Sequence, residues 1–102
     1  MNKHQLGEFE EIVLLAVGIL HGNAYGVTIK AEIEDRLGRE VSVGALQVTL
    51  RRLEKKGYLK SNHGDTEKNR GGRPKLYFTI TAYGKKGLTY VRETRNELWE
   101  AL

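Results

Sequence analysis

The sequence predicts a mostly α-helical domain with one small β-hairpin and a further helix at its C-terminal end. Apolar residues recur at helical spacing in four segments of the chain. Two short stretches with the composition of strands, residues 58–62 and 75–80, flank a loop rich in Gly, Arg and Lys. The chain has 102 residues and no cysteine, so we expect a single core without disulfides, thiolate metal ligands or a thiol nucleophile.

The first helix is expected over residues 9–20, and its apolar residues cover more than one side. Those at helical spacing are Phe9, Ile12, Val13, Ala16, Val17 and Leu20, and the other side adds Leu14, Leu15 and Ile19. A surface helix of a monomer would not expose so many apolar side chains. The helix is therefore either central to the core or shared with a second subunit. Gly22 suits the position that ends it.

A second helix is expected over residues 27–37, with Ile29, Ile33 and Leu37 on one side. Gly38 ends it, and Ser42 is a good N-cap for the third helix. Two short helices joined by a brief turn that contains glycine are typical of a helix-turn-helix.

The third helix combines one apolar face with one basic face. At 100° per residue, the apolar face contains Leu46, Leu50, Leu53 and Gly57, and the opposite arc contains Gly44, Gln47, Val48, Arg51, Arg52 and Lys55. Small residues permit close approach to a DNA groove, an amide can pair with a base edge, and arginine can reach phosphate or guanine. The alternative interpretation is an ordinary solvated amphipathic helix.

The hairpin favours the DNA interpretation. Its loop contains Lys68, Arg70, Gly71, Gly72, Arg73 and Pro74. Residues 42–81 carry nine basic and three acidic side chains, whereas residues 1–41 carry four basic and seven acidic ones, so the positive charge is focused on this helix and hairpin. The order of these elements along the chain, a helix-turn-helix followed by a basic hairpin, matches a winged helix-turn-helix that binds double-stranded DNA. The candidate contacts are Ser42, Gly44, Ala45, Gln47, Val48, Arg51, Arg52, Lys55, Lys68, Arg70, Gly71 and Arg73. The alternative is a hairpin whose charges only aid solubility.

Three segments, YGVTIKAEI, VGALQVTLRRLEKKGYL and GGRPKLYFTIT, resemble the PadR family of bacterial transcriptional regulators, and the resemblance spans residues 6–102. It implies a winged-helix dimer that usually represses its targets and dimerises through a C-terminal helix. The family often has tyrosine and then a small residue or proline after the leucine of the third helix, whereas Gln47 and Val48 follow Leu46 here. No operator sequence of the family therefore carries over.

Residues 1–81 are expected to form the winged helix-turn-helix, and residues 82–102 the C-terminal dimerisation helix with Thr81 as N-cap. Its apolar stripe is Leu88, Val91, Leu98 and Leu102, too thin to stand alone in water. We expect this helix to pack on the first helix of a second subunit in a homodimer, or alternatively within one monomer. A small aromatic effector stacked on Trp99 is one hypothesis, and the simpler interpretation is that Trp99 anchors the dimer.

The sequence contains no pattern typical of an enzyme active site or of a metal site. His4, His21 and His63 are scattered, so each is expected to be solvated or capping rather than a zinc ligand. No phosphate loop or nucleophile elbow is present, and no cofactor is implied. The apolar run IVLLAVGIL is too short to span a membrane, which predicts a cytoplasmic protein. The alternative function is a winged helix that binds protein without binding DNA.

Overall fold

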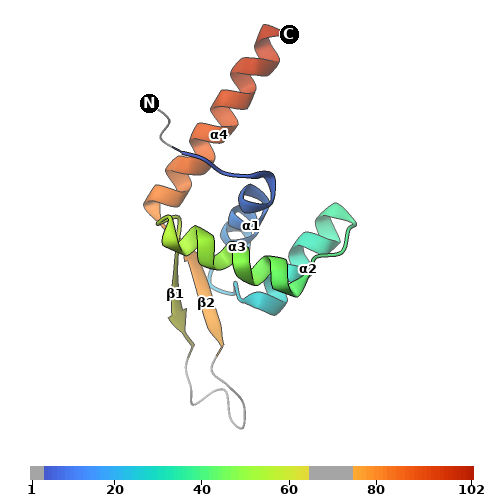
Figure 1. Cartoon of the computed structure of the whole chain (residues 1–102), viewed down its shortest axis with the longest axis vertical. Helices are drawn as coiled ribbons and strands as arrows, with labels where there is room; N and C mark the ends of the chain where they lie inside the picture. The colour runs from blue at the N-terminus through green and yellow to red at the C-terminus, as the bar shows by residue number, and fades with distance from the viewer. Residues whose placement is uncertain (1–3, 65–74) are drawn as a thin grey trace.

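The computed structural model describes residues 4–64 and 75–102 of the chain. Within these ranges it contains α1 (Glu8–Ile19), α2 (Gly26–Leu37), α3 (Val43–Lys55), β1 (Leu59–His63), β2 (Leu76–Ile80) and α4 (Ala82–Ala101). The two strands form an antiparallel hairpin. The predicted mostly helical fold with a hairpin is confirmed. Figure 1 shows α4 and the hairpin extending from opposite ends of the molecule, whose longest dimension is 55 Å.

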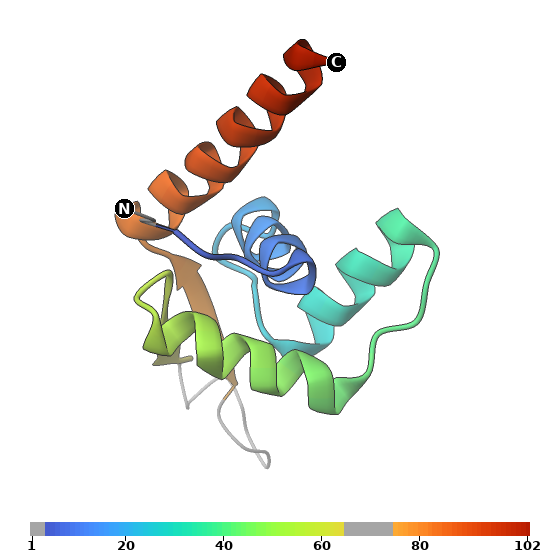
Figure 2. The ribbon, with the colours of Figure 1, turned by 45° about the horizontal axis from the view of Figure 1, so that its top comes forward.

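Helix α1 lies at the centre of the fold, with α2, α3 and α4 around it (Figure 2). The buried core consists of Val13, Leu14, Ala16, Val17, Ala24, Ile29, Ile33, Val41, Leu46, Leu50, Leu53, Tyr58, Leu59 and Phe78. Of the two alternatives for the first helix, the central position is therefore observed, and sharing with a second subunit stays a prediction. Two of its apolar side chains are nevertheless left on the surface, because Leu15 is 44% exposed and Ile19 is 51% exposed.

The predicted helix boundaries are confirmed where a cap residue marks them. The Ser42 hydroxyl oxygen accepts a hydrogen bond from the Ala45 N–H at 3.2 Å, and that of Thr81 accepts one from the Gly84 N–H at 2.9 Å. Gly38 ends α2 with a left-handed φ of 65°.

The placement of Gly57 on the buried face of α3 is wrong. The helix ends at Lys55, and Gly57 is exposed in the following turn with a φ of 87°. A glycine takes this conformation at low cost, so it reverses the chain toward β1 instead of continuing the helix. The apolar periodicity of α3 ends one turn earlier than the sequence pattern indicated.

An ion pair between the buried Glu10 and the exposed Lys56 joins the start of α1 to the end of α3. The Lys56 ammonium contacts both carboxylate oxygens of Glu10, at 3.0 and 2.9 Å, and the Gly7 N–H donates to the same carboxylate at 2.8 Å. Burial alone would raise the pKa of Glu10, but the Gly7 hydrogen bond and the Lys56 charge outweigh it and hold this pKa below its ordinary value of 4.5.

This arrangement predicts how acid destabilises the protein. Because the folded state keeps Glu10 ionised to lower pH than the unfolded chain does, the stabilisation is present above the ordinary pKa and is lost as the pH falls through the lowered one. We expect Glu10→Gln to lower the free energy of unfolding at pH 7 by about 1 to 2 kcal/mol. Urea titrations at several pH values measure this effect, and a gap between variant and parent that stays constant down to about pH 3 would contradict it.

The expectation that His4 is solvated or capping is also wrong. Its ring lies near Tyr58, in the turn before β1, and near two tyrosines of α4, with centroids 5.7 Å from Tyr58, 4.9 Å from Tyr83 and 5.5 Å from Tyr90. The His4 Nδ1 atom is 3.0 Å from the Tyr58 hydroxyl. Gly87 makes room for this contact, since a Cβ there would lie 3.1 Å from the Tyr58 ring. The N-terminal segment is thereby tied to the beginning of α4.

Candidate nucleic-acid interface

Helix α3 presents one face to the core and the opposite face to the surface. Its buried residues are Leu46, Thr49, Leu50 and Leu53. The predicted contact residues that are exposed are Ser42, Gly44, Ala45, Val48, Arg51, Arg52 and Lys55. All seven are therefore on the surface, and Figure 2 shows α3 itself along the outer edge of the fold.

The charges of this face are not cancelled by neighbouring carboxylates. Across residues 4–64 and 75–102, neither Arg51 nor Lys55 forms an ion pair. Arg52 differs from Arg51 because it lies nearer to α1. Burial raises the pKa of Glu10 in α1, and hydrogen bonds from Gly7 and Lys56 lower it. The positive charge of Arg52 also lowers this pKa, so Arg52 interacts with a carboxylate of the protein itself. Arg51 and Lys55 are therefore the cations most available to an external anion on α3.

Gln47 is only half-exposed, unlike the other predicted contact residues of this helix. Its side-chain nitrogen reaches the start of α2, where a Cβ built on Gly26 would lie 3.3 Å from it. The amide thus sits in the corner between α2 and α3 rather than pointing freely into solvent. Base reading by Gln47 stays a prediction.

The hairpin is anchored in the core and extends from it. Leu59 pairs with Ile80 at the buried end and His63 with Leu76 at the far end. The buried Phe78 donates its backbone N–H to the Ala24 carbonyl at 2.8 Å, which joins β2 to the turn before α2. The predicted loop contacts Lys68, Arg70, Gly71 and Arg73 lie outside the described residues.

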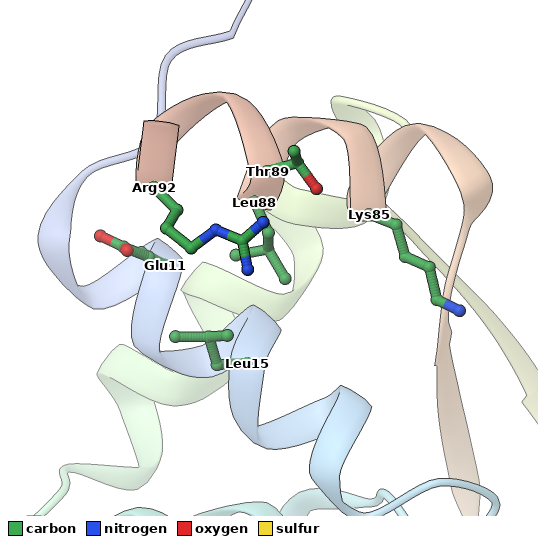
Figure 3. A pocket seen from close by; sticks show the side chains of 6 residues that line it. All are labelled: Glu11, Leu15, Lys85, Leu88, Thr89 and Arg92. Atoms are coloured by element: carbon green, nitrogen blue, oxygen red, sulfur yellow. The ribbon is translucent and has the colours of Figure 1, made fainter. Parts of the chain in front are cut away.

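Trp99 does not line an enclosed cavity in this chain. It is 72% exposed, and the shallow hollow beside it is lined by Leu98 and Leu102. A separate cleft of about 380 Å³ lies between α1 and α4 (Figure 3), lined by Glu11, Leu15, Lys85, Leu88, Thr89 and Arg92. The hypothesis of an effector on Trp99 stays a prediction.

The part of the chain that the structure describes contains neither a membrane-spanning helix nor a cluster of metal ligands. None of its helices is both long and apolar enough to cross a membrane. The same ranges contain no group of three or more His, Asp or Glu side chains placed to hold a metal ion.

Comparison with known proteins agrees with this geometry. The model of the transcriptional regulator PadR-like family matches residues 14–90. A PadR family transcriptional regulator from Eggerthella lenta is 26% identical with a TM-score of 0.72, and the match covers 92% of this chain and 81% of that one. A PadR-like transcription factor from Bacteroides fragilis is 24% identical with a TM-score of 0.76, covering 91% and 84% of the two chains. No curated protein matches.

The same fold occurs in a protein solved with nucleic acid. Bacillus subtilis PadR in complex with operator DNA is 18% identical with a TM-score of 0.66, and the match covers 80% of this chain and 45% of that one. The winged-helix architecture, with α3 and the hairpin on its outer edge, is thus shared with a DNA-bound regulator. The family match spans α2, α3, both strands and the first half of α4. The chain belongs to the PadR-like family of transcriptional regulators, which are not enzymes.

Proposed function

We propose that this protein is a homodimeric repressor that binds a specific sequence of double-stranded DNA through α3 and the hairpin. The observation that carries the proposal is the exposed face of α3, where small residues occupy the first half and the unpaired cations Arg51 and Lys55 occupy the second. Small residues let a helix enter the major groove, and cations beyond them reach the phosphates that flank it.

The proposed contacts divide into two kinds. In this proposal Gly44, Ala45 and Val48 of α3 lie against base edges, and Ser42, the N-cap of α3, lies near a phosphate. Arg51, Arg52 and Lys55 supply sequence-independent attraction. The loop residues predicted from the sequence would extend this contact along the duplex. The Bacillus subtilis protein that shares the fold is seen with operator DNA, which supports the same use of the face here.

The resemblance to the family supports a role in repression. Two exposed apolar surfaces support the formation of a dimer. In one, Leu15, Ile19 and Leu37 border a groove between α1 and α2. In the other, Leu98, Trp99 and Leu102 stand on the end of α4, away from the body of the molecule (Figure 1). We propose that residues 82–102 dimerise by placing the second surface of one subunit against the first surface of the other.

A fluorescence polarisation assay with the duplex upstream of the protein's own gene tests this function. We expect tight binding, and a steep fall in affinity as salt rises, because phosphate contacts release counterions. Arg51→Ala and Lys55→Ala should each reduce the salt slope by about one unit on every duplex. The matched control is Lys86→Ala, which removes the same charge from an exposed position on α4.

The same series separates DNA binding from protein binding. A winged helix that recognises a protein through an apolar surface would show no steep salt dependence with DNA and no selectivity for one duplex. If the parent protein bound neither the upstream duplex nor a random duplex at low salt, the proposed function would be wrong.

A further inference from the structure

One cation at the far end of the hairpin strands, directly before β2, is held in position without being neutralised. The Lys75 ammonium lies 4.6 Å from the centre of the Tyr25 ring and 3.5 Å from its hydroxyl oxygen. Lys75 is exposed and forms no ion pair with any carboxylate in residues 4–64 or 75–102. An aromatic ring attracts an ammonium group but leaves its charge intact. Lys75 is therefore ordered and still available to an anion.

Tyr25 is fixed from the other side. Tyr77 of β2 approaches its ring at a centroid distance of 5.3 Å and an interplanar angle of 63°. The Tyr25 backbone N–H donates to the Thr28 hydroxyl oxygen at 3.0 Å. Tyr77 itself lies over Gly64, where an added Cβ would be 2.7 Å from the Tyr77 ring. Several contacts therefore hold Tyr25 in position, and the position of the Lys75–Tyr25 pair does not depend on a single surface contact.

The exposed polar atoms of this pair offer hydrogen-bond donors to the outside. An ammonium group has three N–H donors and no acceptor, so the oxygen of Tyr25 accepts from Lys75. The phenolic O–H then points away from Lys75, and within residues 4–64 and 75–102 it has no acceptor, so it can donate to a ligand. A positively charged set of adjacent donors fits a ligand with several anionic oxygens, which describes a phosphate group.

The pair lies beside the face of α3 that is proposed to contact DNA. Gly26 follows Tyr25 in the chain, and the side-chain nitrogen of Gln47 lies 3.3 Å from where a Cβ on Gly26 would be. Lys75 comes directly before β2, which the Phe78–Ala24 hydrogen bond ties to the same turn. The beginning of α2, the first half of α3 and the start of β2, at the far end of the hairpin strands, therefore meet at one place on the surface.

We propose that Lys75 and Tyr25 together bind one phosphate of the DNA backbone beside the groove that α3 enters. The inference rests on the proposed function and adds two contact residues that the sequence pattern did not indicate. Phosphate contacts of this kind set the position of a protein on the duplex, and they do not discriminate between base sequences. The pair would fix how α2, α3 and the hairpin sit on the duplex.

Three substitutions test the pair. Lys75→Gln should weaken binding to every duplex by about 3- to 10-fold at moderate salt and reduce the salt slope by about 0.9. Lys75→Arg should restore the slope, because it keeps the charge. Tyr25→Phe should weaken binding by about 3-fold without changing the slope, since it removes a neutral donor and keeps the ring that holds Lys75. Its melting temperature should equal that of the parent.

The matched control is Lys86→Gln, which changes the net charge equally on α4. The proposal is overturned if Lys75→Gln keeps the slope of the parent, or if it and Lys86→Gln have the same effect. It is also overturned if Tyr25→Phe binds as tightly as the parent. These results leave the proposed function standing as long as the parent binds DNA, and only the absence of binding by the parent contradicts that function.

Discussion

Gly84→Ala is expected to destabilise the fold by about 3 kcal/mol, although alanine is the better helix former. Gly84 is buried in the first turn of α4. A Cβ at this position would lie 2.3 Å from the Tyr58 carbonyl oxygen and 2.8 Å from a side-chain carbon of Ile80. The same oxygen accepts the Thr81 N–H at 3.0 Å, so relieving the clash separates α4 from β1 and weakens that bond.

The matched control is Gly44→Ala, because Gly44 also lies in the first turn of a helix. Among the described residues, an added Cβ there would have one neighbour within 4 Å, the Ser42 hydroxyl oxygen at 3.8 Å, which is an ordinary contact. This variant should be as stable as the parent or gain up to about 1 kcal/mol. Urea unfolding followed by circular dichroism, at one protein concentration, measures both variants. Equal stability of Gly84→Ala and the parent would show that α4 does not pack against Tyr58 as described.

Local signals in the sequence predicted the elements well. Ser42 and Thr81 have short polar side chains, which reach the free backbone N–H groups of the helix that begins directly after them. Their role as N-caps can therefore be predicted from their position in the sequence alone. The apolar period of α3 identified its buried leucines because an isolated helix already separates its two faces. The exposed basic face follows from the same period. This is why most of the candidate site on α3 could be predicted.

Contacts between distant segments could not be predicted in this way. Lys56 and Glu10 are 46 positions apart, and His4 and Tyr58 are 54 apart, so no period in the chain relates them. The pairing of Lys75 with Tyr25 likewise depends on β2 lying against the turn before α2. A helical wheel of α3 puts Gln47 on the exposed arc, yet the start of α2 covers part of its side chain. Each of these features depends on how the elements pack.

Ile19→Glu is expected to convert the proposed dimer into a monomer of 11.6 kDa. Ile19 is 51% exposed in the groove between α1 and α2, which is lined mainly by apolar residues and also by the Glu32–Arg36 ion pair. If α4 of a second subunit covers this groove, a carboxylate at residue 19 would lose water beside Glu32, which already pairs with Arg36, and this costs several kcal/mol. The fold of each subunit should persist, because the residue faces solvent in the single chain.

Two further measurements follow from the same variant. Trp99 is the only tryptophan and is 72% exposed in one chain, so its fluorescence should shift to longer wavelength when the dimer is lost. Affinity for the operator duplex should fall by about 100-fold or more, because two half-sites are no longer engaged together. Binding to a single half-site should stay unchanged.

The control for this prediction is Val27→Glu, which adds the same charge at an apolar residue that is 71% exposed and lies outside the groove. Light scattering coupled to size-exclusion chromatography should give twice the chain mass for the parent and for Val27→Glu. If Ile19→Glu also had twice the chain mass, the groove between α1 and α2 would not be the surface that α4 covers. A parent that is itself a monomer at micromolar concentration would exclude the dimer, and then α3 and the hairpin of a single chain would have to account for all of the operator affinity.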